Sequence, residues 1–219
     1  MPEISKASFF NNPFVGLFFK TSDRFALLPS TAPPKVEEQV ASTLGAKPVK
    51  LFVDNSPLLG IFCVMNSNGA VVSSSASQDE LSVLKAEGLN VAVLDRLSPS
   101  NNILANDNAA LASPHMGLSQ IRAVQDALGV EVVQQRISNH SLLAPTTVVT
   151  NRGLLAYNDL TETELRQLER IFRVRGAVGT SNAGTIYNAL GVVANSKGAV
   201  VGMATTGFES QRIYEALFG

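Results

Sequence analysis

The sequence is poor in cysteine and tryptophan, and its charges nearly cancel. The 219 residues include a single cysteine, Cys63, and no tryptophan. One cysteine cannot form a disulfide within the chain, which fits a protein of a reducing compartment. With 17 basic and 18 acidic residues the net charge is −1. The chain therefore lacks the overall positive charge that is typical of proteins that bind DNA.

Long apolar runs are also missing, and the first residues do not show the pattern that is typical of a secretory leader. Residues 1–10 show no basic start followed by an apolar run, so we expect no signal peptide. No apolar stretch approaches the roughly 20 residues that span a membrane. We therefore expect a cytoplasmic protein with no membrane partner. Apolar residues make up 45% of the chain and charged residues 16%, which indicates a globular protein with a substantial core.

What the sequence does contain is one short string that recurs along the chain. Asn195 to Gly202 reads Asn-Ser-Lys-Gly-Ala-Val-Val-Gly, and Asn66 to Val72 reads Asn-Ser-Asn-Gly-Ala-Val-Val. Three weaker copies bring the total to five, at a spacing of about 40 to 45 residues. A unit of this size cannot bury its apolar face alone. We therefore predict a single domain of five internal repeats, with approximate units 11–54, 55–98, 99–138, 139–182 and 183–219, plus 1–10 as a closing strand.

Each copy of the string predicts a β-hairpin. A short Asn/Gly segment between apolar runs is typical of a turn that needs a positive φ, which Gly and Asn adopt at low cost. The first strands are expected at 14–19, 58–65, 103–105, 146–149 and 189–194. The second strands are expected at 25–28, 70–72, 109–112, 153–157 and 199–203.

After each hairpin the apolar period becomes helical, as in Val36, Val40 and Leu44. Ser77 with Glu80, and Thr161 with Glu164, predict capping boxes at two helix starts. A third strand follows four of the helices, at 48–53, 89–94, 130–133 and 174–178. The fifth unit lacks this strand, whereas the spare segment 4–10 precedes the first hairpin. We therefore predict an α/β fold in which the N-terminal strand joins the last unit and closes a ring.

Residues capable of catalysis or metal binding are scarce. Cys63 lies in an apolar run without a base or cation that would lower its pKa, so a small buried hydrophobe is the favoured interpretation. His115 and His140 show no metal-ligand spacing. We expect no catalytic residue, no metal and no cofactor.

Polar, uncharged residues gather instead at the starts of the hairpins. In a ring, equivalent loops lie on one face, which suits either ordinary loop chemistry or a docking surface. The candidates are Asn12, Asn55, Ser56, Asn101, Asn102, Ser141 and Asn182.

Three strings carry a resemblance to a known family. They are Val193 to Gly202 followed by Thr205-Thr206-Gly207, Val148 to Gly153, and Gly179 to Gly184. Together with the five-unit pattern, they resemble the translation initiation factor six family, the ribosome anti-association factors, in its archaeal form. The resemblance covers the full chain.

This resemblance implies a pentein fold, a β/α propeller of five strand-strand-helix-strand units. It implies binding to the large ribosomal subunit at its subunit-joining surface, near the sarcin–ricin loop RNA, where the factor blocks the small subunit. It also implies a role in translation initiation and large-subunit maturation, without catalysis. Asn101 aligns with a family Asn at the ribosome contact, although this chain has Ser98-Pro99-Ser100 where the family usually has Ala-Leu-Gly.

Two other classes remain open at this point. Some penteins resemble one another as guanidine-group hydrolases or amidinotransferases, which use a nucleophilic cysteine near the end of the chain. Here no cysteine follows Cys63. The other class is an interaction scaffold with a non-ribosomal partner. For the ribosome-binding factor we expect a monomer.

Overall fold

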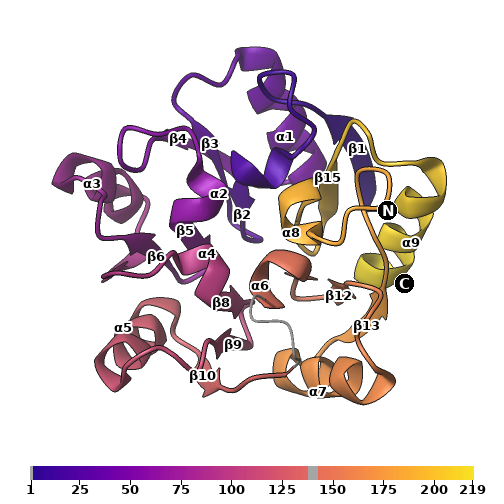
Figure 1. Ribbon diagram of the computed structural model, residues 1–219. Helices are drawn as coiled ribbons and strands as arrows, with labels where there is room; N and C mark the ends of the chain where they lie inside the picture. The colour runs from indigo at the N-terminus through magenta and orange to yellow at the C-terminus, as the bar shows by residue number, and fades with distance from the viewer. Residues whose placement is uncertain (1, 138–142) are drawn as a thin grey trace.

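Five three-stranded sheets form the framework of the molecule, and Figure 1 shows them arranged around a common centre with the long helices outside. The computed structural model describes residues 2–137 and 143–219. Each unit repeats one order of elements. A short helix leads into two antiparallel strands, a long helix follows, and a further strand then pairs in parallel with the second strand.

The elements run through the five units in the same order. The first unit contains η1 (Val15–Leu17), β2 (Lys20–Thr21), β3 (Phe25–Pro29), α1 (Pro34–Leu44) and β4 (Lys47–Leu51). The second contains α2 (Leu59–Phe62), β5 (Cys63–Met65), β6 (Gly69–Ser73), α3 (Gln78–Ala86) and β7 (Asn90–Leu94). The third contains α4 (Pro99–Asn102), β8 (Ile103–Ala105), β9 (Ala109–Ala112), α5 (Leu118–Leu128) and β10 (Glu131–Gln134).

The fourth unit contains α6 (Leu143–Thr146), β11 (Val148–Val149), β12 (Gly153–Ala156), α7 (Glu162–Phe172) and β13 (Arg175–Val178). The fifth contains α8 (Asn188–Gly191), β14 (Val192–Ala194), β15 (Gly198–Gly202) and α9 (Gly207–Phe218). The predicted second strands, long helices and third strands are confirmed, with ends that shift by a few residues. None of the described helices is long and apolar enough to cross a membrane.

Four of the five predicted first strands are wrong in part or in full, because residues within them form short helices. Segment 14–19 contains η1, and the leading residues of 58–65, 146–149 and 189–194 lie in α2, α6 and α8. Only β8 matches its predicted strand in full. An apolar run this short does not distinguish a buried strand from a buried helix. The short helices pack closely on one another, since a Cβ added at Gly60 in α2 would lie 1.7 Å from the carbonyl oxygen of Gly16 in η1.

The hairpin turns form for a different reason from the one predicted. None of the recurring turn glycines adopts a positive φ. In the fifth turn, Asn195 Oδ1 instead accepts hydrogen bonds from the backbone N–H groups of Lys197 and Gly198, at 2.9 and 3.1 Å. Glycine is required at Gly198 because a Cβ there would lie 2.0 Å from the Thr43 carbonyl oxygen. The expectation of a positive φ at these turns is therefore wrong.

The same asparagine also joins neighbouring units. Asn195 is 2% exposed, and its Nδ2 donates to the carbonyl oxygens of Ser22 and Leu44 at 2.9 and 2.8 Å. Asn66 makes equivalent bonds to Asn106 and Leu128. One buried amide thus satisfies its own turn, the next turn and the end of a long helix, as buried polar groups require.

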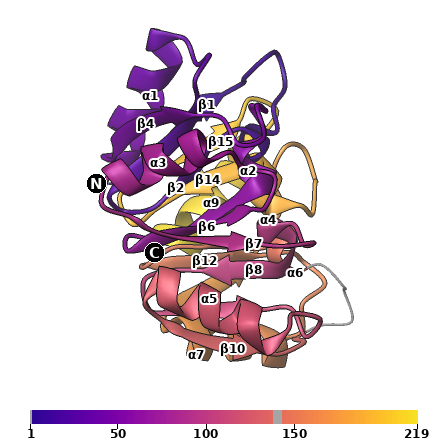
Figure 2. The ribbon, with the colours of Figure 1, turned by 90° about the vertical axis from the view of Figure 1, so that its left-hand side faces the viewer.

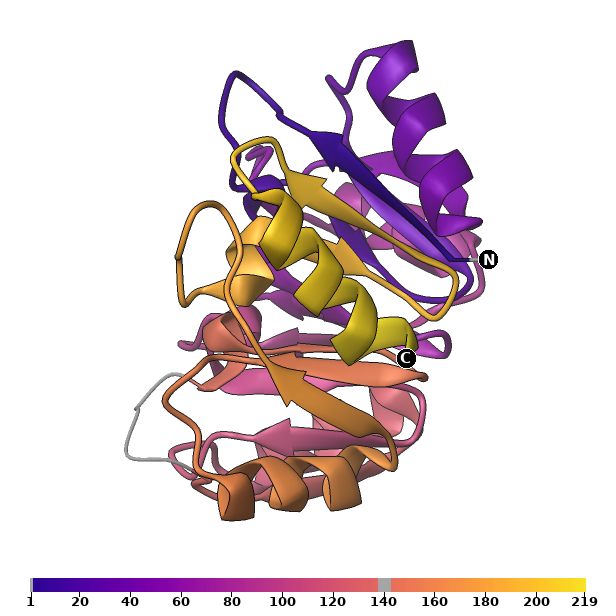
Figure 3. The same cartoon turned by 90° about the vertical axis from the view of Figure 1, so that its right-hand side faces the viewer.

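The N-terminal strand joins the last unit, as predicted, but it ends at Ala7, so residues 8–10 of the predicted strand 4–10 are not part of it. β1 (Glu3–Ala7) pairs in parallel with β15, from Glu3 opposite Gly198 to Ala7 opposite Gly202. Around the centre, β2 contacts β5, β5 contacts β8, β8 contacts β11, β11 contacts β14, and β14 contacts β2. Figure 3 shows that both termini lie at the same end of the molecule.

Candidate interaction face

One face of the molecule is built from the five short helices and the loops that precede them, and we call it the short-helix face. Its elements η1, α2, α4, α6 and α8 contact one another in a closed cycle. In the side view of Figure 2, α2, α4 and α6 lie opposite the face that carries both termini. The loops of all five units therefore converge on one side, where a large partner can meet them together.

Tight turns hold the candidate residues on this face. Phe10 and Asn11 both have positive φ, as do Asp54 and Asn55, and each pair sits inside an isolated two-residue bridge. This is the geometry of the type I′ turn, which favours Asn and Gly. The turn at Asn182 is one residue longer and has φ values of 46° at Asn182 and 59° at Ala183. Asparagine at these positions is thus explained in part by backbone conformation.

Several of the candidate side chains are engaged inside their own loops. Asn12 Oδ1 accepts a hydrogen bond from the Phe14 N–H at 2.9 Å, and Ser56 Oγ accepts one from the Leu58 N–H at 3.2 Å. Asn102 Nδ2 donates to the Ser98 carbonyl oxygen at 2.9 Å. These three side chains therefore organise the approach to a short helix.

Asn182 joins two units rather than pointing outward. Its Nδ2 donates to the Pro13 carbonyl oxygen at 2.9 Å, and its Oδ1 accepts from Thr205 Oγ1 at 3.3 Å. The turns of the fifth and first units are thereby held side by side. Ser141 lies outside the described residues.

Asn55 and Asn101 differ from the other described candidates, because both are exposed and their side chains make no hydrogen bond within the described chain. Asn101 lies in the four-residue helix α4, where a loop was expected. With Asn102 and Ile137 it borders a shallow hollow of about 50 Å³. A free amide that can both donate and accept is suited to recognise a polar partner group. These two residues are the strongest contact candidates on the short-helix face.

Exposed aromatic rings form a second feature of this face, which the sequence analysis did not identify. Phe10 is 65% exposed and Tyr187 is 44% exposed. Phe10 occupies the turn before η1, and Tyr187 caps α8, which contacts η1. Aromatic side chains are enriched at protein interfaces. Phe10 falls inside the strand predicted at 4–10, and Tyr187 precedes the one predicted at 189–194, so the sequence pattern did not indicate their exposure.

Two glutamates at the starts of long helices accept hydrogen bonds from the backbone of the turns on the short-helix face. Glu80, at the start of α3, accepts from the N–H groups of Asp54 and Asn55 at 3.0 and 2.9 Å. It also accepts from the Ser77 N–H at 2.9 Å, which completes the predicted capping box. Burial raises the pKa of Glu80, but these backbone donors outweigh burial and hold the pKa below its ordinary value.

Glu209 repeats this arrangement in the fifth unit. Its carboxylate accepts from the N–H groups of Ala183 and Gly184 at 3.1 and 2.8 Å, and from Thr206 at the start of α9. Burial raises its pKa too, and the hydrogen bonds from Thr206, Gly184 and Thr180 lower it below the ordinary value. The Thr206–Glu209 capping box has the same sequence pattern as the two that were predicted, but it was missed.

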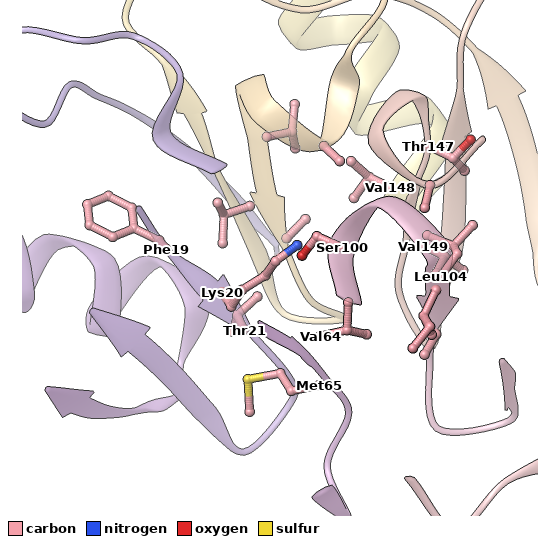
Figure 4. Close-up of a pocket in the computed structure, with 17 residues that line it drawn as sticks. Phe19, Lys20, Thr21, Val64, Met65, Ser100, Leu104, Thr147, Val148 and Val149 are labelled. Atoms are coloured by element: carbon pink, nitrogen blue, oxygen red, sulfur yellow. The ribbon is translucent and has the colours of Figure 1, made fainter. Parts of the chain in front are cut away.

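A cavity of about 80 Å³ lies among the inner strands near the centre. Figure 4 shows Lys20 pointing into it toward Ser100. Lys20 is the one ionisable side chain among the described residues that line the cavity, and burial lowers its pKa.

Nearby Cys63 is fully buried, and burial raises the pKa of its thiol to about 12. A thiol in this state is unsuited to act as a nucleophile.

Metal ligands are not gathered at any one place. Among the described residues, no group of three His, Cys, Asp or Glu side chains is placed to hold a metal ion. His115 lies exposed, and His140 falls outside the described residues.

Comparison with known proteins decides the family. The family model described as "eIF-6 family" matches residues 4–216. The chain belongs to this family. It is similar to the protein named Translation initiation factor 6 of Pyrobaculum aerophilum, at 36% identity over 219 residues that cover 99% of this chain and 100% of the relative.

Two further archaeal relatives carry the same name. The Saccharolobus islandicus protein is 33% identical over 220 residues and covers 98% of each chain. The Thermococcus onnurineus protein is 35% identical over 223 residues, which cover 98% of this chain and 97% of the relative. Membership of this eIF-6 family supports a role in translation initiation and identifies the chain as a non-enzymatic factor. The interpretation as a hydrolase or amidinotransferase is set aside.

Proposed function

We propose that this protein binds the large ribosomal subunit and sterically prevents premature joining of the small subunit. The observation that carries the proposal is the family match along nearly the entire chain, to relatives that are named as a translation initiation factor. In this proposal the chain is a single pentein domain of five repeats that acts as a cytoplasmic monomer and also takes part in large-subunit maturation.

The short-helix face is the proposed contact surface. It gathers the loops of five units on one side, and it carries the free amides of Asn55 and Asn101 with exposed Phe10 and Tyr187. A specific protein contact needs roughly 800 Å² per partner, which a face of this breadth can supply. With a net charge of −1, long-range attraction to RNA is weak, so we expect ribosomal protein to provide much of the contact beside the sarcin–ricin loop.

Sedimentation with purified large subunits tests this function. We expect the protein to sediment with large subunits and not with small subunits. Adding it before the small subunit should reduce the yield of joined ribosomes. If it binds large subunits without changing subunit joining, the proposed anti-association role is wrong. If it binds neither subunit, the partner is not the ribosome.

The substitution Asn101→Asp tests the contact surface. The exposed Asn101 side chain makes no hydrogen bond within the described chain, so the variant should fold normally. A negative charge would face the partner without a counter-charge, and we expect affinity for large subunits to fall at least about tenfold, or about 1.4 kcal/mol.

Gln125→Glu is the matched control, because it makes the same change from amide to acid on the exposed side of α5. It should bind as the wild-type protein does. Equal binding by both variants would place the contact away from Asn101.

A further inference from the structure

The turns of the short-helix face hold left-handed backbone where partners are expected to meet them. Asp54 and Asn55 have φ values of 59° and 52°, and Ala183 has 59°. Asn and Asp adopt this left-handed region more readily than other non-glycine residues, whereas alanine adopts it at a cost of about 1 kcal/mol or more. Such strain persists only where the surrounding structure fixes the backbone.

The fixing groups come from the first turn of the long helix that follows each loop. Glu80 accepts both N–H groups of the Asp54–Asn55 turn, and Glu209 accepts those of Ala183 and Gly184. Each glutamate is also the third helical residue and completes a capping box. One carboxylate therefore fixes a left-handed turn to a rigid helix end.

The third unit has the same arrangement with the opposite hydrogen-bond polarity. There the third residue of α5 is Gln120, whose Oε1 accepts from the Gly117 N–H at 2.9 Å and whose Nε2 donates to the Asp95 carbonyl oxygen at 2.9 Å. The loop presents a carbonyl instead of N–H groups, and the side chain is an amide instead of a carboxylate. Glutamate and glutamine thus match what the loop offers, which indicates that the contact to the loop, and not helix capping alone, determines the residue at this place.

We propose that Glu80, Gln120 and Glu209 are positioning residues that hold the loops of the short-helix face in their partner-binding conformation. This inference rests on the proposed function and deepens it. A partner that binds only the locked turn gains affinity when the turn is already in place, because the population of the competent conformation scales the apparent affinity. The first unit offers a contrast, since its Phe10–Asn11 turn receives no carboxylate from α1 among the described contacts.

The test compares Glu80→Gln with Ser77→Ala. The first variant keeps size but replaces one of the two carboxylate oxygens with an NH2 donor. Asp54 and Asn55 bond different oxygens of Glu80, so one of these two N–H groups loses its acceptor and faces a donor. The second removes the hydroxyl that accepts from the Glu80 N–H at 3.3 Å, and it leaves the carboxylate on the turn. Both weaken the same helix start, so a purely structural effect would appear in both.

Two readouts are needed, amide hydrogen exchange and affinity for large ribosomal subunits. In Glu80→Gln the amides of Asp54 and Asn55 should exchange faster, and affinity should fall about fivefold. In Ser77→Ala both should stay close to wild type. Glu209→Gln should free Ala183 and Gly184 in the same way. Gln120→Glu should free the Asp95 loop, because a carboxylate would then face a carbonyl oxygen.

The possible results separate the two proposals. Equal losses in Glu80→Gln and Ser77→Ala, or faster exchange with unchanged affinity, would overturn the positioning role and leave ribosome binding intact. Failure of the wild-type protein to bind large subunits would overturn the proposed function, and with it the part of the positioning role that concerns ribosome binding. In that case the exchange data still show whether the carboxylate holds the turn.

Discussion

Asparagine side chains on the short-helix face differ in whether they already have a hydrogen-bond partner within the chain. Asn12 and Asn102 are bonded to nearby backbone, whereas Asn101 is free. The sequence indicated which residue types gather before the short helices. It could not show which amides are already satisfied, because the partners are backbone groups whose position depends on the folded loop.

Cys63 illustrates the same point for chemistry. Its burial and its pKa of about 12 make it a structural residue, as its apolar neighbours predicted. Cys63→Ser should leave binding to large subunits unchanged and should lower thermal stability modestly, because it places a hydroxyl in an apolar strand. Sedimentation and a thermal unfolding curve measure the two effects. Loss of binding by a folded variant would show that the thiol has a functional role.

Hairpins and long helices were predictable because each has a strong local signal. Alternation between an Asn/Gly turn and apolar runs marks the second strands, and a helical period with Ser77 and Glu80 marks α3. The short helices have no such signal. Their conformation is set by neighbours that are distant in sequence, such as the Gly16 backbone against Gly60.

Helix caps should make folding stability sensitive to acid. The folded-state pKa of Glu209 is lowered below the ordinary value of 4.5 by its hydrogen bonds. Its contribution to stability is therefore fully present above that value, and it is lost as pH falls through the folded-state pKa. We expect the free energy of unfolding to decline below pH 4.5, and to decline less steeply in Glu209→Gln.

Urea unfolding at a series of pH values from neutral to acidic provides the measurement. Glu38→Gln, on the exposed side of α1, is the control, because it also removes one carboxylate. Identical slopes for Glu209→Gln and the wild-type protein would show that the carboxylate does not govern the acid response.

At the scale of the whole molecule, β1 joins the two ends of the chain. Its residues pair with β15, and Phe9 just beyond it is 3% exposed against Phe18 and Phe19. Deleting residues 2–10 removes a parallel ladder and a buried ring, and should lower the free energy of unfolding by several kcal/mol. Urea or thermal unfolding checks this. An unchanged melting temperature would mean that the pairing contributes little.

The pairing of β1 with β15 also determines when the first strand can join its sheet during synthesis of the chain. Residues 3–7 leave the ribosome early, yet their partner strand ends at Gly202, near the end of the chain. At about 5–20 residues per second, the first strand waits on the order of 10 to 40 seconds for its partner. Throughout that wait its backbone donors and acceptors are available to any strand edge nearby, including one on another nascent chain. The segment made first is thus the last to find its place in the sheet.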